Sequence, residues 1–203
     1  MRTVRFPGHP QETSENAVDL AHLSCVHGFD EVRQVGAVAV DGPTLRTAFD
    51  FTQRVAYAGM PIASFDVSAH VTVLGLGYSF VEVHERSIGM QTRLWTLATP
   101  VDGTLIDLTL VSQVRQIRHP RRRIVGLAFL PTMLRTQLMN QFVLAQELLG
   151  VRQDQVIWSR KRYQPRPRLC RSDGEIMTYR AWCAQFYPDL GMASGRANGT
   201  GAA

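Results

Sequence analysis

Ser64–Leu74 reads Ser-Phe-Asp-Val-Ser-Ala-His-Val-Thr-Val-Leu and indicates the fold more clearly than any other stretch. From position 67 to position 73, apolar residues at the odd positions alternate with polar residues at the even ones. A period of two places apolar side chains on one face of a strand and polar ones on the other. The stretch is therefore predicted to be a half-buried β-strand, with one face on the core and one in water.

Five neighbouring runs are rich in β-branched and aromatic residues and are also predicted to be strands. They are Gln34–Val40, Leu45–Val55, Tyr78–His84, Met90–Ala98 and Thr104–Val114. Turn-forming residues separate them at 41–43, 58–61, 75–77 and 102–103. Connections this short favour an antiparallel sheet, because parallel strands need long crossovers.

Helices are expected before and after these strands in the sequence. Residues 13–27 are predicted as one short helix, which Ser14 caps and Gly28 ends. A long helix is predicted from Pro131 to Lys161, with Gly150 as a point where it bends or divides. Its apolar residues recur near a 3.6-residue period at Leu134, Leu138, Phe142, Ala145 and Leu149.

A final helix is expected over residues 174–186, and residues 190–203 are expected to form a disordered tail. Residues 1–189 are then one domain. The predicted class is α+β, with one antiparallel sheet of about six or seven strands and helices before and after it.

Composition sets limits on the kind of protein. The chain of 203 residues is 45% hydrophobic and 19% charged, as is usual for a soluble globular protein with one sizeable core. No apolar run approaches the ~20 residues of a membrane helix, and the N-terminus has no apolar signal region. Three cysteines make neither a disulfide framework nor a zinc motif, so a reducing cytoplasm is the expected compartment.

Two arginine-rich clusters, between Arg115 and Arg123 and between Arg160 and Arg171, concentrate the net charge of +5. A solvated surface, an anionic ligand and an acidic protein partner are all compatible with them. Nucleic acid is not favoured as a partner. The second cluster holds a single aromatic residue, Tyr163, and the chain has no recognised nucleic-acid motif.

The spacing of Asp19, His22 and His27 carries the chemistry. On an ideal helix Asp19 and His22 share a face, whereas His27 is rotated from His22 by about 140°. Both imidazoles reach one metal only if the helix widens or ends between them, and Gly28 favours an end. Two imidazoles and a carboxylate suit Fe(II) and leave positions open for O₂ and substrate. Asp154, on the predicted long helix, is the candidate carboxylate.

These residues also have a plain structural interpretation. A single His-x4-His pair is weak support for a metal site. Asn16 and Asp19 fit the polar face of a helix, and Asp154 alone fits an ordinary surface position. The spacing by itself leaves both interpretations open.

Four blocks of sequence, taken in order, resemble the catalytic domain of Rieske non-haem iron oxygenases, closest to the 3-ketosteroid 9α-hydroxylase and cholesterol 7-desaturase group. Asn16–His27 resembles the iron-binding helix. Gly150–Trp158 (GVRQDQVIW) resembles the G-x-x-Q-D-x-x-I-W stretch. Residues 167–175 resemble the P-L-L-C…D-G-P segment, with Glu175 in place of a proline. Arg180–Tyr187 resembles the R-x-W-Y-x-Q-F-Y ending, with cysteine at position 183 in place of a tyrosine.

This resemblance implies a role for each matching residue. His22 and His27 would hold mononuclear Fe(II), and Asp154 would complete the facial triad. Asp19 would be the bridging aspartate that contacts a ligating histidine and leads electrons from a Rieske [2Fe–2S] cluster. Asn16 would lie close to the iron. The implied fold is a helix-grip (START-like) domain, in which the sheet wraps around the long C-terminal helix over a deep pocket.

The implied reaction is reductive O₂ activation, with hydroxylation or desaturation of an apolar, steroid-like polycyclic substrate. No cysteine here has a histidine two or three residues after it, so the Cys-x-His and Cys-x2-His pairs of a Rieske domain are missing. The cluster is expected from a missing domain or another polypeptide, with a ferredoxin or reductase as electron donor. Relatives are often homotrimers, and the oligomeric state stays open.

Two other functions compete with this one. A helix-grip domain also binds sterols without metal, so the chain fits a non-catalytic sterol- or lipid-binding module or an inactive remnant of an oxygenase. A standalone iron enzyme using 2-oxoglutarate is less favoured, because no residue pattern indicates that cosubstrate.

Overall fold

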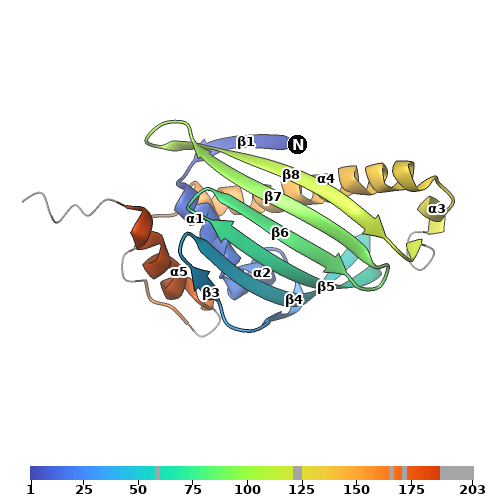
Figure 1. Ribbon diagram of the computed structural model, residues 1–203, viewed down its shortest axis with the longest axis horizontal. Helices are drawn as coiled ribbons and strands as arrows, with labels where there is room; N and C mark the ends of the chain where they lie inside the picture. Colours follow the sequence, from blue (N-terminus) through green and yellow to red (C-terminus); the bar gives the residue numbers. More distant parts are fainter. Residues whose placement is uncertain (58–59, 121–124, 165–166, 171–172, 188–203) are drawn as a thin grey trace, which may run out of the picture.

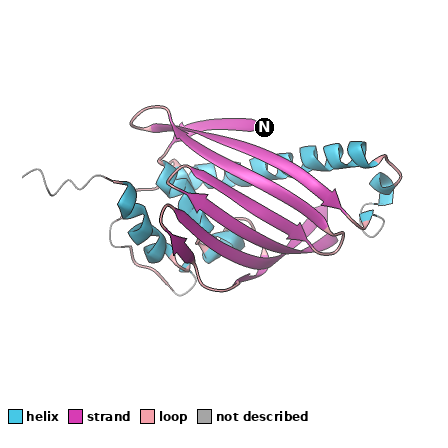
Figure 2. Ribbon diagram, in the orientation of Figure 1, coloured by secondary structure: helices cyan, strands magenta, loops and turns pink. Residues whose placement is uncertain are grey.

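The chain forms a twisted antiparallel sheet with its helices on one side, as the computed structural model shows (Figure 1, Figure 2). The structure describes residues 1–57, 60–120, 125–164, 167–170 and 173–187, and only the backbone at 55–57, 60–63 and 125. One face of the sheet is open to solvent, and the other faces the helices. The predicted α+β class with a long helix on an antiparallel sheet is confirmed.

Eight strands make up the sheet, rather than six or seven. Their order is β1-β8-β7-β6-β5-β4-β2, and β3 pairs separately with β4. The bounds are β1 Arg2–Pro7, β2 Asp30–Gln34, β3 Ala39–Asp41, β4 Thr44–Tyr57, β5 Met60–Leu74, β6 Tyr78–Glu85, β7 Met90–Pro100 and β8 Leu105–Ile117.

The sequence-based errors lie at the sheet edges. Edge strand β1 was not predicted, because its partner β8 is distant in sequence. The predicted strand Gln34–Val40 is wrong, since Gly36 takes a positive φ of 75° and divides it between the end of β2 and the short β3. Positive φ suits glycine and interrupts a strand.

The alternating stretch in β5 behaves as predicted. Val67, Ala69, Val71 and Val73 are all buried on the side of the sheet that faces the helices. Register with β4 places Leu45 and Phe49 on that same face, opposite Val73 and Ala69. A core cluster at one end of the molecule joins this face to Val18 and to three side chains of the last helix, Ile176, Tyr179 and Trp182.

The helices are α1 Pro10–Ser14, η1 Glu15–Ala17, α2 Leu20–Cys25, α3 Val125–Ala128, α4 Thr132–Trp158, α5 Ile176–Cys183 and η4 Ala184–Phe186. The single helix predicted over 13–27 is therefore wrong. Its residues form the end of α1, the turn η1 and the separate helix α2. The chain leaves helical geometry at Asp19, with φ −91° and ψ 98°, so that this residue can cap α2.

Helix α4 is confirmed, but Gly150 does not divide it. Gly150 instead lies against His27, whose Cε1 would be 3.5 Å from an added Cβ. The apolar series that predicted the helix is largely exposed, including Phe142 at 51% and Leu149 at 52%. The buried face carries other side chains, namely Leu144, Val151 and Trp158, which pack on β1 and β8.

Some expectations fall outside the described residues. They concern the tail at 190–203 and part of both arginine clusters, at Arg121–Arg123, Arg166 and Arg171. In the part of the chain that is described, we find no helix of the length and apolarity required to cross a lipid bilayer.

A network of ion pairs joins the N-terminal segment to the two C-terminal helices. Glu15, which is 4% exposed, accepts hydrogen bonds from Arg180 Nε at 2.6 Å and from Lys161 Nζ at 2.8 Å. Lys161 also lies 2.7 Å from Glu12. The sequence had placed Lys161 in a basic cluster, yet its charge is neutralised within the fold.

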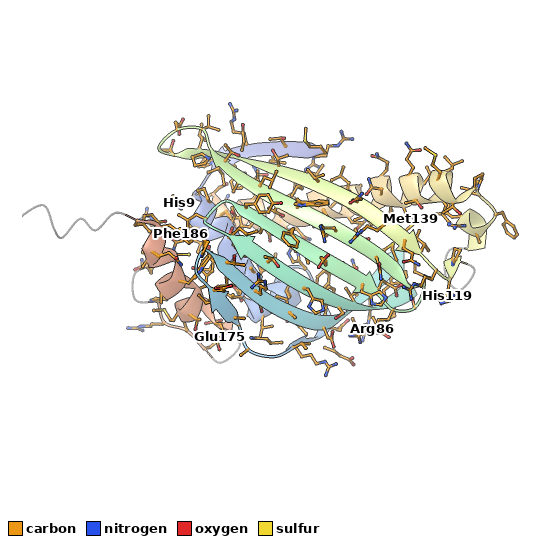
Figure 3. The ribbon with its side chains drawn as sticks, in the orientation of Figure 1. His9, Arg86, His119, Met139, Glu175 and Phe186 are labelled. Carbon is orange, nitrogen blue, oxygen red and sulfur yellow. The ribbon has the colours of Figure 1, made fainter. Side chains whose placement is uncertain are left out.

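Aromatic and hydroxyl contacts strengthen the same junction. The Tyr179 hydroxyl donates to the backbone oxygen of Gln11 at 2.8 Å, and the Tyr187 hydroxyl donates to its side chain at 2.6 Å. The rings of His9 and Tyr187 stack with centroids 6.2 Å apart. Figure 3 shows His9 and Phe186 together at this end of the molecule. Segments from both ends of the described chain thus form one packed unit.

We expect Glu15→Gln to destabilise the protein by about 3 kcal/mol at pH 7, because it leaves two cationic side chains without their shared partner. Burial alone would raise the pKa of Glu15, but hydrogen bonds from Arg180 and Lys161 outweigh it and hold that pKa below its usual range. The carboxylate therefore contributes stability above its unfolded pKa of about 4.3, and loses it as pH falls through the folded value.

Urea unfolding at pH 7 and below about pH 4 measures the effect, and the gap between parent and variant should shrink at the lower pH. Glu82→Gln is the matched control. Glu82 pairs with Arg93 on the open face of the sheet, where an exposed ion pair contributes ~1 kcal/mol or less. Equal losses for the two variants would contradict the prediction.

Candidate metal centre

The first histidine is placed by the helix cap at Asp19. The Asp19 Oδ1 accepts a hydrogen bond from the backbone N–H of His22 at 3.0 Å. This is the N-cap contact that satisfies a free donor in the first helical turn. The cap fixes where α2 begins, and His22 in its first turn has an imidazole that is almost fully buried.

The second histidine comes into reach because α2 ends early. The last helical residue is Cys25, and Gly28 follows with a φ of 68°. His27 is thus outside the helix, and its ring meets the ring of His22 edge to face, with centroids 4.5 Å apart. The predicted helix end between the two imidazoles is confirmed.

Helix α4 brings the third group. Asp154 is 6% exposed, and its Oδ1 lies 3.2 Å from His22 Nε2 and 3.6 Å from His27 Nε2. The two Nε2 atoms are 2.9 Å apart. All three atoms lie within 4.8 Å of one another, so the fold gathers the predicted ligand set at one point.

The state of these groups suits a cation. Asp154 Oδ1 is buried and has no hydrogen-bond partner in the described part of the chain, because its 3.2 Å contact with His22 lacks hydrogen-bond geometry. A buried carboxylate oxygen without a partner carries a large desolvation cost. One such oxygen beside two imidazole nitrogens is the arrangement that a bound metal ion would satisfy.

The protonation state of His27 also suits metal binding, because its surroundings favour the neutral imidazole. Burial lowers its pKa, although the charge of Asp154 and a hydrogen bond to Gln153 oppose the shift. Its Nδ1 lies 3.2 Å from Gln153 Oε1, and a proton donated there leaves the lone pair on Nε2. A neutral imidazole held in this tautomer is what metal ligation needs.

Two further predicted residues lie beside the three. The Asn16 amide nitrogen, from the turn η1, is 3.1 Å from His22 Nε2. Asp19 makes its observed contact with the backbone of His22, whereas the resemblance implied a contact with a ligating ring. Burial raises the pKa of Asp19, and hydrogen bonds from the backbone of His22 and Ala21 partly oppose this shift.

Sequence reasoning missed the supports of this centre. Gln153 and Gly150 contact His27, and Glu15 anchors the turn that carries Asn16. Gln153 lay inside the resemblance block at 150–158, next to Asp154, and that adjacency was the available signal. Nothing in the sequence marked Glu15, because its partners lie on α5 and just beyond the end of α4.

One cavity adjoins the centre, and a second accessible surface lies on the sheet. A cavity of about 380 Å³ lies among η1, α2, the end of α4 and α5, and Asn16, Asp19, His22 and Asp154 are in its wall. The second surface is the helix-facing side of the sheet between β6 and β7. Val83 and Leu94 point to that side but are only partly buried, since α4 packs on β8 and β1.

Comparison with known proteins places the chain in a group. The profile of the family "3-Ketosteroid 9alpha-hydroxylase C-terminal domain" matches residues 1–187. "Cholesterol 7-desaturase nvd 1" of Ciona intestinalis is 27% identical over 221 aligned positions, which cover 94% of this chain and 42% of that protein. The chain therefore spans less than half the length of this relative.

Solved structures share the fold. The NdmA QL mutant of Pseudomonas putida CBB5 with theobromine has a TM-score of 0.57 at 15% identity, over 91% of this chain and 48% of that chain. Dicamba monooxygenase bound to dicamba has a TM-score of 0.52 at 9% identity, over 91% of this chain and 56% of that chain. The chain belongs to the family of 3-ketosteroid 9α-hydroxylase C-terminal domains, among the catalytic domains of Rieske-type oxygenases.

Proposed function

We propose that residues 1–189 are the catalytic domain of a Rieske-type oxygenase, which holds one Fe(II) through His22, His27 and Asp154. The domain hydroxylates or desaturates a steroid-like apolar substrate with O₂. One observation carries the proposal. Three ligand atoms from two distant segments converge within 4.8 Å, and the carboxylate oxygen among them is buried without a hydrogen-bond partner.

The residues around the proposed iron site have different roles. The two imidazoles and the carboxylate would hold the ion and supply three of its ligands, a set that suits Fe(II). Gln153 holds the His27 ring in its metal-binding tautomer, and the Asn16 amide limits the space beside His22. When bound, Fe(II) supplies the O₂ chemistry, for which no amino-acid side chain is suited. Hydroxylation and desaturation share a first hydrogen abstraction, so the proposal covers both.

The substrate class follows from the relatives and from the sheet. The family and the Ciona intestinalis relative are named for a 3-ketosteroid and for cholesterol, both apolar polycyclic compounds. In this chain the partly exposed apolar side chains of Val83 and Leu94 lie on the helix-facing side of the sheet. Such a surface suits an apolar ligand, because ligand sites are mostly apolar with few polar groups.

Electrons must come from a Rieske cluster outside these 203 residues. Asp19, which lines the cavity beside His22, is the proposed path of entry. A homotrimer, in which each cluster serves the neighbouring subunit, is the assembly that the family resemblance offers. Exposed arginines such as Arg115 and Arg160 suit an acidic ferredoxin or reductase. The three cysteines, too few for a disulfide framework, support a reducing cytoplasm.

We expect the purified chain, loaded without oxygen, to bind near-stoichiometric Fe(II). His22→Ala and Asp154→Ala should each bind it at least ~10-fold more weakly, because each removes a ligand. Metal analysis after desalting gives the measurement, and anaerobic titration gives the affinities.

The control is His84→Ala, which removes an exposed histidine on the open face of the sheet. It should bind iron as the parent does. If the parent retained no iron but bound sterols, the enzymatic proposal would be wrong, and a non-catalytic sterol-binding module would take its place.

The cap and electron-path roles of Asp19 are separable by substitution. Asp19→Ala should lower the free energy of unfolding by about 1 kcal/mol, whereas Asp19→Asn should keep the cap through its amide oxygen. With a Rieske partner supplied, Asp19→Asn should bind iron normally yet turn over substrate more slowly. Iron content, urea unfolding and turnover are measured on both variants. Unchanged turnover in Asp19→Asn would remove Asp19 from the electron path.

A further inference from the structure

Glu147 lies on the side of α4 that faces the sheet. Its carboxyl group is not part of the proposed iron site. The residue lies on α4 between Leu144 and Val151, the residues that pack against β8. Asp154 is seven residues further along, which is two helical turns or roughly 10 Å along the axis. Glu147 and Asp154 therefore lie on the same side of α4, separated by about that distance.

The surroundings of Glu147 leave its carboxyl unpaired. Among the described residues no group donates a hydrogen bond or forms an ion pair to it. The side chain is only partly exposed, and burial, together with the charge of Asp154, raises its pKa to about 7. A carboxyl held in such a place loses solvation without gaining a partner.

The helix-facing side of β6 and β7 combines apolar side chains with small hydroxyl groups. Val83 and Leu94 are partly exposed there, and the nearby Thr92 hydroxyl is buried without a partner in the described chain. A ligand between α4 and these strands would therefore meet apolar side chains, neutral hydroxyls such as those of Thr92 and Thr96, and the already hydrogen-bonded carboxylate of Glu85. Well-placed polar groups in such a site fix the orientation of the ligand and provide its specificity.

We propose that Glu147 is the specificity residue of this domain, and that its carboxyl hydrogen-bonds an oxygen substituent of the polycyclic substrate. The inference rests on the function proposed above and names the group that orients the substrate. A carboxyl with two oxygens can accept from a hydroxyl, or donate to a keto oxygen when protonated. The separation along α4 would place a carbon of a rigid fused-ring skeleton beside His22, His27 and Asp154.

The opposing interpretation is that Glu147 has no role in binding and that the fold simply accommodates its carboxyl group. Two features argue against it. Surface glutamates are usually fully solvated, whereas Glu147 shares a helix face with buried Leu144 and Val151. A neutral residue there would also avoid the desolvation cost, so an unpaired carboxyl is expected to have a ligand to meet.

Equilibrium binding of three probes to the full chain tests the proposal without requiring turnover. The probes are 5α-cholestan-3β-ol, 5α-cholestan-3-one and 5α-cholestane, which share one saturated skeleton and differ only in the oxygen substituent at C3. The parent should bind the two oxygenated probes roughly 3- to 10-fold more tightly than 5α-cholestane, as one hydrogen bond provides. Glu147→Leu should bind all three about equally, through the loss of that preference.

Two further variants make the outcome decisive. Glu147→Gln should keep most of the preference, because an amide both donates and accepts. Gln146→Leu introduces the same side chain at the neighbouring exposed position of α4 and should behave as the parent. Retained binding of 5α-cholestane by Glu147→Leu shows that this variant is folded, and Glu147→Ala serves in its place if it is not.

A parent-like preference in Glu147→Leu, or in Glu147→Ala where that replaces it, would overturn the role of Glu147 and leave the iron-site proposal intact. A parent that binds none of the probes, with iron bound normally, would overturn both the role of Glu147 and the steroid-like substrate class. A parent that binds no iron would instead overturn the proposed metal centre.

Discussion

The close approach of His22, His27 and Asp154 is the constraint on which the rest of the site depends. Three groups that prefer water are held within 4.8 Å of one another in a largely buried place. Folding does not replace the hydrogen bonds to water that these groups lose, since the buried Asp154 Oδ1 gains no hydrogen bond. The local architecture is shaped to keep them together: a cap starts α2, a glycine turn ends it, and a long helix supplies the carboxylate.

A second set of contacts keeps those pieces in register. Glu15 precedes Asn16 directly, and its carboxylate binds Lys161, just beyond α4, and Arg180 of α5. Pairing buried charges in this way offers little net stability compared with an apolar core, but it fixes geometry. The turn that carries Asn16 and the helix that carries Asp154 are thereby tied together, close to the atoms where a fraction of an ångström matters.

Helix α4 has two faces with different roles. Leu144, Val151 and Trp158 anchor it on β1 and β8, while Asp154 and Glu147 lie on the same side without protein partners suited to them. Its opposite face is apolar yet exposed at Phe142 and Leu149. One helix thus combines an anchor, a carboxylate of the candidate metal centre and a candidate group for substrate recognition.

The sequence by itself determined the class of fold, the central strands and the long helix, and it indicated the two candidate histidines. It did so because alternation in β5, helical periodicity in α4 and the Asp-x-x-His-x4-His spacing are local patterns that reflect local geometry. The outer strands β1 and β2 and the break at Asp19 escaped prediction. The pairing of an edge strand depends on a partner that is distant in sequence. Whether Asp19 caps a new helix or continues the previous one depends on the tertiary contacts around it.

Only the tertiary structure decided which face of α4 packs, because its periodic apolar residues are the exposed ones and its buried face includes Asp154. It also decided that Glu15 is paired and that Glu147 is not. Each of these outcomes requires groups far apart in the chain to be near one another or to be kept apart. A pattern along the sequence carries the period of an element, whereas the identity of its neighbours is set when the sheet and helices pack.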